Sequence, residues 1–216
     1  MAKKNPQAGL EESLRKAPIV PVMVIEDVKQ AVPLARALVR GGLPVLEITL
    51  RTPAALECIK AILAEVEGAI VGSGTVLTAQ QLKQSEKAGC VFAVSPGATV
   101  KLVKAAKDYG LSLLPGAATA SEAMALLEHG YTLQKFFPAE QAGGAAYLAS
   151  LFSPLPQIKF CPTGGITPAL APNYFKLANV ITLGGSWMAP KAMVNEGKWD
   201  AIEQLAREAA ALRKPI

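Results

Sequence analysis

Histidine and cysteine are scarce in this chain of 216 residues, which contains one histidine and three cysteines. Catalytic metal sites are usually built from clusters of histidine, cysteine and carboxylate side chains, so we expect no metal site and no metal cofactor. The cysteines, Cys58, Cys90 and Cys161, are odd in number, far apart and without CxxC spacing. This pattern is typical of reduced core thiols in a cytosolic protein, and it argues against a disulfide framework.

Long apolar runs are also missing. No stretch of about 18 or more apolar residues indicates a transmembrane helix. The basic N-terminus lacks the apolar segment of a secretory signal, because Glu11 and Arg15 interrupt the region that follows it. The net charge is +5, but the densest positive group, Lys101, Lys104 and Lys107, has the spacing of a solvated helix face. We therefore expect a cytoplasmic protein that binds small anionic metabolites, with no nucleic-acid or membrane partner.

Short β-rich runs alternate with amphipathic stretches along the chain, and no linker separates them. Their starts are about 21 to 26 residues apart, the spacing of a compact strand–helix unit. The predicted strands are Ile19–Ile25, Pro44–Leu50, Ala69–Val76, Cys90–Pro96, Leu111–Ala117, Thr132–Ala139, Ile158–Gly165 and Asn179–Trp187. The predicted helices include Leu10–Lys16, Val28–Arg40, Pro53–Glu67, Ala79–Ala88, Val100–Tyr109, Ser121–His129, Leu170–Leu177 and Asp200–Leu212.

Eight strand–helix units in a chain of this size predict an α/β fold, a single closed (β/α)8 TIM barrel, because parallel strands need helical crossovers and covered faces. We expect one barrel domain over residues 1–216, with residues 1–17 forming an N-terminal extension and an extra helix. An open doubly wound sheet is the alternative. It usually has a Gly-rich dinucleotide-binding turn after its first strand, and none follows Ile19–Ile25.

A lysine in a buried strand is the first candidate for chemistry. Lys135 lies in the apolar run Thr132–Ala139, and an unpaired ammonium away from water is costly. Desolvation favours the neutral amine, which is a nucleophile able to form a Schiff base with a carbonyl substrate. The alternative is that Lys135 lies near the strand end and extends its ammonium to solvent.

The second predicted strand has one apolar face and one polar face. Leu46, Ile48 and Leu50 alternate with Glu47, Thr49 and Arg51, which follows the strand period of two. A polar face is unusual in an all-parallel sheet, so we expect Glu47 to point into the barrel and Arg51, about 13 Å further along, to reach its rim. Glu47 would then shuttle protons for the lysine, and Arg51 would bind a substrate carboxylate. A Glu47–Arg51 ion pair is the less natural alternative.

Glycine-rich segments end three of the predicted strands. In Gly72-Ser73-Gly74-Thr75-Val76 the glycines allow a ligand to approach closely and Thr75 offers a hydroxyl. Thr163-Gly164-Gly165 and Gly184-Gly185-Ser186 end the seventh and eighth strands. The loops after strands seven and eight are the recurrent phosphate site of TIM barrels, so these two segments predict a phosphate site.

Six motifs stand in order along the chain, and together they resemble one family. They are Glu47–Thr52 (EITLRT), Gly72–Val76 (GSGTV), Ser95–Gly97 (SPG), Lys135–Glu140 (KFFPAE), Phe160–Ile166 (FCPTGGI) and Gly184–Trp187 (GGSW). From about residue 18 to the C-terminal helix the chain resembles the bacterial 2-keto-3-deoxy-6-phosphogluconate (KDPG) aldolases. Members of this family often also act as 4-hydroxy-2-oxoglutarate aldolases.

The resemblance implies a metal-free class I aldolase of the Entner–Doudoroff pathway, on a (β/α)8 barrel and usually homotrimeric. It would cleave KDPG reversibly to pyruvate and glyceraldehyde 3-phosphate, and its partner would be a small 2-keto acid. The implied Schiff-base lysine is Lys135 and the implied general acid/base is Glu47. The remaining implied site residues are Arg51 and Thr75 at the pyruvate carboxylate, Pro96 and Phe137 lining the pocket, and Thr163, Gly164, Gly165, Gly184, Gly185 and Ser186 at the phosphate.

Other features have structural explanations. Lys159 stands at the start of its predicted strand, where barrels place stability rather than catalysis. His129 closes a predicted helix, as a C-terminal capping residue does. Two rival functions remain open: a phosphosugar isomerase or epimerase on the same barrel, and a catalytically silent oligomeric scaffold. The preference among KDPG, its galactonate epimer and 4-hydroxy-2-oxoglutarate also stays open.

Overall fold

The structure, a computed structural model, describes residue 7 and residues 9–212. Its strands are β1 (Ile19–Met23), β2 (Val45–Thr49), β3 (Ile70–Gly74), β4 (Phe92–Val94), β5 (Ser112–Leu114), β6 (Gly116–Ala117), β7 (Leu133–Phe136), β8 (Lys159–Pro162) and β9 (Leu183–Gly185). Its helices are α1 (Leu10–Arg15), α2 (Val28–Arg40), α3 (Ala55–Glu65), α4 (Ala79–Lys87), α5 (Val100–Ala106), α6 (Ala120–Glu128), α7 (Gly144–Phe152), α8 (Ala171–Phe175), α9 (Lys191–Asn195) and α10 (Trp199–Ala210).

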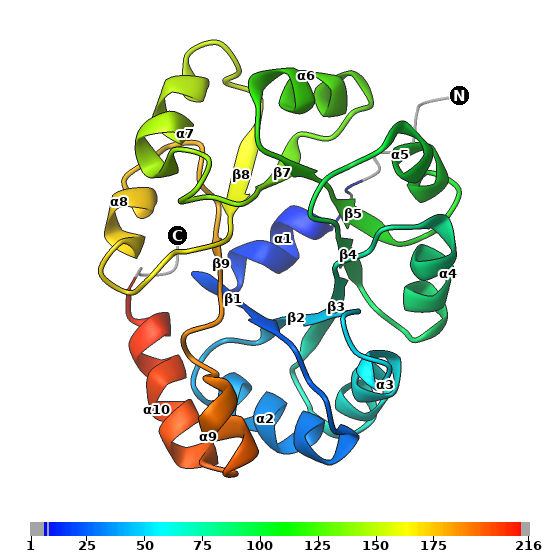
Figure 1. Cartoon of the computed structure of the whole chain (residues 1–216), viewed down its shortest axis with the longest axis vertical. Helices are drawn as coiled ribbons and strands as arrows, with labels where there is room; N and C mark the ends of the chain where they lie inside the picture. The colour runs from blue at the N-terminus through cyan, green and yellow to red at the C-terminus, as the bar shows by residue number, and fades with distance from the viewer. Residues whose placement is uncertain (1–6, 8, 213–216) are drawn as a thin grey trace.

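The strands pair in parallel and form two sheets, ordered β5-β4-β3-β2-β1-β9 and β6-β7-β8. In Figure 1 they curve around the centre of the view, and the helices other than α1 lie outside them. The predicted α/β class with parallel strands is therefore confirmed. Buried apolar residues on both faces explain this arrangement: Val45, Leu46 and Ile48 of β2 are all fully buried.

All the predicted strands are shorter in the structure, and two of them differ most from the prediction. The run predicted over residues 111–117 divides into β5 and β6 at Pro115, because proline has no N–H group to donate to a sheet. The last predicted strand, residues 179–187, contains only β9 and an isolated parallel bridge between Val180 and Phe160. A second isolated bridge joins Thr163 to Gly184, so the residue that follows β8 lies beside β9.

The predicted N-terminal helix is present as α1, which lies across the centre of the view in Figure 1. Leu10 and Leu14 bury its apolar side. Glu11 accepts a 2.7 Å hydrogen bond from Lys159, the first residue of β8. This contact places α1 at the amino ends of the strands and confirms a structural role for Lys159. The rest of the predicted extension, residues 1–6 and residue 8, lies outside the described residues.

The sequence pattern did not single out α7 and α9. Helix α7 is preceded by Gly143, which has φ 108° and no side chain to cap the N-terminus, so the usual start signal is missing. Helix α9 has 5 residues, too few for a periodic pattern. In the described part of the chain, no helix is long and apolar enough to cross a membrane.

Candidate active site

A lysine and a glutamate meet inside the curled strands. Lys135 on β7 and Glu47 on β2 are each 3% exposed, although 88 residues separate them in sequence. The lysine Nζ lies 3.2 Å from Oε1 and 3.5 Å from Oε2 of the glutamate. Each charge compensates the other, because an isolated ion would be costly at this depth. The prediction that Lys135 is buried and not snorkelling is confirmed.

The polar face of β2 points where the strand period predicted. Leu46 and Ile48 pack into the core, while Glu47 reaches across to Lys135. Thr49 is also fully buried and donates its hydroxyl to the carbonyl of Met23. Strand β2 thus delivers a carboxylate to the interior and keeps its other polar side chain hydrogen-bonded.

Arg51 follows β2 and is exposed, as expected at the rim. Its Nε donates a 2.9 Å hydrogen bond to Oγ1 of Thr75, which follows β3. Thr75 has φ 56°, and among the described residues it is the one non-glycine residue with positive φ. Such a conformation is costly for a β-branched residue and is enriched at functional sites. The alternative of a Glu47–Arg51 ion pair is not observed among the described residues; Glu47 pairs with Lys135.

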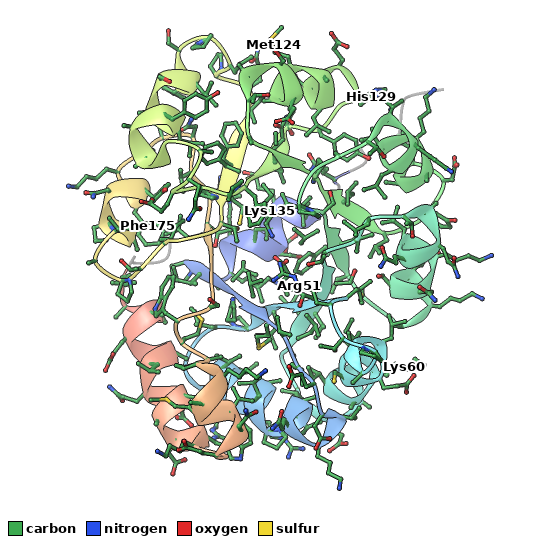
Figure 2. All side chains as sticks on the ribbon, viewed as in Figure 1. Arg51, Lys60, Met124, His129, Lys135 and Phe175 are labelled. Atoms are coloured by element: carbon green, nitrogen blue, oxygen red, sulfur yellow. The ribbon has the colours of Figure 1, made fainter. Side chains whose placement is uncertain are left out.

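Figure 2 shows Lys135 and Arg51 near the centre of the view, inside the curved strands, whereas His129 lies toward the outside. His129 is the residue after the last turn of α6, as predicted.

The two residues predicted to line the pocket follow β7 and β4. The ring of Phe137, which follows β7, has its centroid 5.4 Å from the Lys135 Nζ, a cation–π distance. Pro96 follows β4 and is half-buried, with its carbonyl close against Gly116 of β6.

The glycines of β3 make room for protein side chains. A Cβ at Gly74 would lie 2.3 Å from the Glu47 carboxylate, and a Cβ at Gly72 would lie 2.2 Å from the ring of Phe92. The expectation that both glycines let a ligand approach is therefore wrong: their space is filled by Glu47 and Phe92. Gly74 belongs to the site in another sense, because only a residue without a side chain lets Glu47 lie beside Lys135.

The two Gly-rich segments predicted to bind phosphate lie next to each other. The Thr163–Gly184 bridge joins them, and a Cβ at Gly184 would lie 2.2 Å from the Thr163 hydroxyl. Gly164 and Gly165 have φ of 106° and 76°, a conformation that favours glycine. Ser186 is exposed and borders a cavity of about 380 Å³ between β1, α2 and α9. The space beside Gly185 is taken by the ring of Trp187.

Sequence reasoning did not single out Cys161 for the site. It lies opposite Lys135 in the β7–β8 register and is 3% exposed. Burial raises the pKa of its thiol to about 12, partly offset by the nearby Lys135 ammonium. The thiol therefore stays neutral at physiological pH. Cys58 and Cys90 are buried and unpaired as well, as predicted. Residues 7 and 9–212 contain no cluster of three or more His, Cys, Asp or Glu side chains that could hold a metal ion.

A buried lysine–carboxylate pair, with an arginine just beyond the end of the strand that carries the carboxylate, is typical of an α/β enzyme. Comparison with known proteins identifies the family. Residues 10–205 match the KDPG and KHG aldolase family. The chain therefore belongs to this family, and it is an aldolase, that is, a lyase.

Individual relatives agree over almost the full length. The 2-dehydro-3-deoxy-phosphogluconate aldolase of Pseudoalteromonas atlantica is 50% identical over 208 residues, which cover 96% of this chain and 97% of that protein. The KHG/KDPG aldolase of Escherichia coli K12 is 48% identical over 206 residues, covering 95% and 97%.

Solved structures superpose closely on this fold. The KDPG aldolase of Zymomonas mobilis ZM4, crystallised with 3-phosphoglycerate, gives a TM-score of 0.89 at 49% identity and covers 95% of this chain and 96% of that one. The KDPG aldolase of Legionella pneumophila, in which pyruvate was captured at low pH as a covalent carbinolamine intermediate, gives a TM-score of 0.91 at 39% identity, covering 96% and 99%.

Proposed function

We propose that this enzyme is a class I aldolase that cleaves KDPG reversibly to pyruvate and glyceraldehyde 3-phosphate through a Schiff base on Lys135. The observation that carries the proposal is the buried Lys135–Glu47 pair, with 3.2 Å between Nζ and Oε1. A lysine that is buried this deeply does not contribute to the charged surface of the protein, and the carboxylate of Glu47 beside it can accept its proton. The carbinolamine of the Legionella pneumophila relative supports covalent chemistry with pyruvate in this family.

The distance between the two groups suits proton transfer. Glu47 takes a proton from the Lys135 ammonium, and the neutral amine attacks the ketone carbon of the substrate. Glu47 then returns that proton to the carbinolamine hydroxyl, which leaves as water and gives an iminium. The iminium accepts the electron pair of the C3–C4 bond as that bond breaks, while the C4 hydroxyl proton passes to Glu47 and the aldehyde departs. Protonation of the enamine and hydrolysis then release pyruvate and restore the lysine.

The two ends of the substrate have separate partners in this proposal. Arg51 binds the carboxylate end through the guanidinium nitrogens that Thr75 leaves uncovered, since only its Nε donates to the Thr75 hydroxyl. Pro96 and Phe137 flank the reacting carbons. The phosphate lies against the loops of Thr163, Gly164 and Gly165 and of Gly184, Gly185 and Ser186, where backbone N–H groups bind an anion.

We also propose that the strands close into the predicted (β/α)8 barrel as one domain. Three observations support closure. Pro115 alone separates β5 from β6, and the bridges Phe160–Val180 and Thr163–Gly184 connect the segment of β8 with that of β9. A homotrimer in the cytoplasm remains part of the proposal on the family resemblance, and sedimentation of the purified enzyme tests the assembly.

Family membership favours the aldolase over a phosphosugar isomerase or epimerase, and the intact Lys135–Glu47 pair argues against a silent scaffold. Substrate choice is tested by measuring pyruvate release from KDPG, its galactonate epimer and 4-hydroxy-2-oxoglutarate with a lactate dehydrogenase couple. We expect KDPG to have the highest kcat/KM and 4-hydroxy-2-oxoglutarate to be cleaved more slowly. If none of the three releases pyruvate, the proposed function is wrong.

A further inference from the structure

One charged residue beside the site has no part in the mechanism above. Glu140 ends the motif that begins at Lys135, and its half-buried carboxylate accepts a hydrogen bond from the hydroxyl of Tyr174. Tyr174 belongs to α8, the helix that follows the loop of Gly164 and Gly165. A residue from the β7 loop is thereby tied to the helix beyond the β8 loop.

The backbone around Glu140 holds the same loop. The N–H of Ala139 donates to the carbonyl of Thr163 at 2.8 Å, and the N–H of Glu140 donates to the carbonyl of Gly164 at 3.1 Å. The carbonyl groups of the loop thus face the β7 segment. Its N–H groups are the ones that the proposed phosphate site requires, so the orientation of this loop decides whether they can bind an anion.

The Glu140 side chain packs directly under the loop. A Cβ at Gly165 would lie 2.9 Å from the Cβ of Glu140, and a Cβ at Gly144 would lie 3.4 Å from its carboxylate and 3.6 Å from the Tyr174 hydroxyl. Two glycines with positive φ therefore surround this pair. Tyr174 is 1% exposed, and burial together with the Glu140 carboxylate raises the pKa of its phenol, so it remains a donor at neutral pH.

We propose that Glu140 and Tyr174 are positioning residues that fix the Gly164–Gly165 loop in the shape that binds the substrate phosphate. The pair touches neither Lys135 nor Glu47, so it acts on the distal end of the substrate alone. This inference rests on the proposed function, because it assigns a support to the phosphate site of that proposal. The positioning role predicts that substitutions at this pair affect the reaction of KDPG and not that of 4-hydroxy-2-oxoglutarate, because 4-hydroxy-2-oxoglutarate has no phosphate.

The test compares Tyr174→Phe, which removes only the hydroxyl, with the wild-type enzyme on both substrates. We expect KM for KDPG to rise about tenfold, as for loss of a hydrogen bond to a charged group. kcat for KDPG and both constants for 4-hydroxy-2-oxoglutarate should stay within about twofold. Glu140→Ala should reproduce this split, and Glu140→Gln, which keeps an acceptor oxygen, should restore most of the KDPG affinity.

Tyr147→Phe is the matched control, because Tyr147 on α7 stacks on Phe136 instead of bonding Glu140. It should leave every constant unchanged. Thermal unfolding of each variant shows whether it is folded at the assay temperature. Unchanged KM for KDPG in a folded Tyr174→Phe enzyme, or equal losses on both substrates, would overturn the positioning role. Failure of the wild-type enzyme to form a pyruvate adduct would instead contradict the proposed function, so the two failures are distinguishable.

Discussion

Two lysines on neighbouring strands form ion pairs in opposite surroundings. Lys159 at the amino end of β8 bonds Glu11 at 2.7 Å, and both side chains are about 40% exposed, at 42% and 39%. Lys135 on β7 lies 3.2 Å from Glu47, and both side chains are 4% exposed. The shorter ion pair is expected to be the weaker one, because water and salt screen exposed pairs much more than buried pairs. Burial, more than distance, separates the pair that we propose to be catalytic from the exposed pair.

Removing each lysine should give the largest contrast. We expect Lys135→Ala to lower kcat for KDPG cleavage by about four orders of magnitude or more, because the nucleophile is lost. Lys159→Ala should keep kcat within about twofold. Lys135→Ala also leaves the Glu47 carboxylate buried and unpaired, which destabilises a fold by roughly 3–5 kcal/mol. Activity is therefore measured at a temperature where urea titration shows both variants to be folded. Comparable losses in the two variants would remove the distinction.

Glu47→Gln asks whether the carboxylate transfers protons or only compensates a charge. The glutamine keeps the shape that Gly74 accommodates but cannot accept the proton. We expect kcat to fall by roughly two to four orders of magnitude, with little change in pyruvate binding. Glu11→Gln is the counterpart at the other end and should leave kcat unchanged. Near wild-type turnover of Glu47→Gln, with chemistry shown to be rate-limiting, would require another base.

Two glycine substitutions compare the proposed phosphate loop, at the carboxyl ends of the strands, with a turn at their amino ends. Gly165→Ala places a side chain where φ is 76° and where Glu140 leaves no room. We expect kcat/KM for KDPG to fall by roughly 10- to 100-fold as the loop shifts, with a much smaller effect on 4-hydroxy-2-oxoglutarate. Gly68→Ala is the control: it has a similar φ of 80° but only an ordinary contact at 3.9 Å, and it precedes β3. Equal losses on both substrates would point to a folding defect or another anion site.

The smallest expected effect is the pH dependence of the stability that the exposed Glu11–Lys159 ion pair contributes. The hydrogen bond from Lys159, opposed by partial burial, holds the pKa of Glu11 below its usual 4.5. A lowered pKa contributes stability above pH 4.5 that is lost as pH falls through the folded value. We expect Glu11→Gln to lose about 0.5 kcal/mol at pH 7, and its difference from wild type to vanish in acid. Urea titrations at pH 7 and below pH 4 measure this; a difference that grows in acid would be contrary to the sign.

Charged residues that interrupt an apolar strand pattern were predictable from the sequence. Contacts between residues that are far apart in the sequence were not. Lys135 and Glu47 could be identified because a charged residue in a run that reads as a buried strand is unusual, and the sequence alone shows this. What fills the space at Gly72 and Gly74 depends on which side chains lie opposite, and strand pairing decides that. The Glu140–Tyr174 contact spans 34 residues and depends on the short helix α8, which no local pattern joins to β7. Helix α7 was not predicted for a different reason: it follows Gly143, which has no side chain to cap the helix.

The central claim is that Lys135 forms the Schiff base, and trapping with pyruvate and borohydride tests it most directly. Borohydride reduces an iminium to a stable secondary amine, so the adduct can be located by peptide mass spectrometry. We expect one adduct per chain, on Lys135, in wild-type enzyme and in Lys159→Ala, and none in Lys135→Ala. An adduct on Lys159, or none on a wild-type enzyme that cleaves KDPG, would contradict the account.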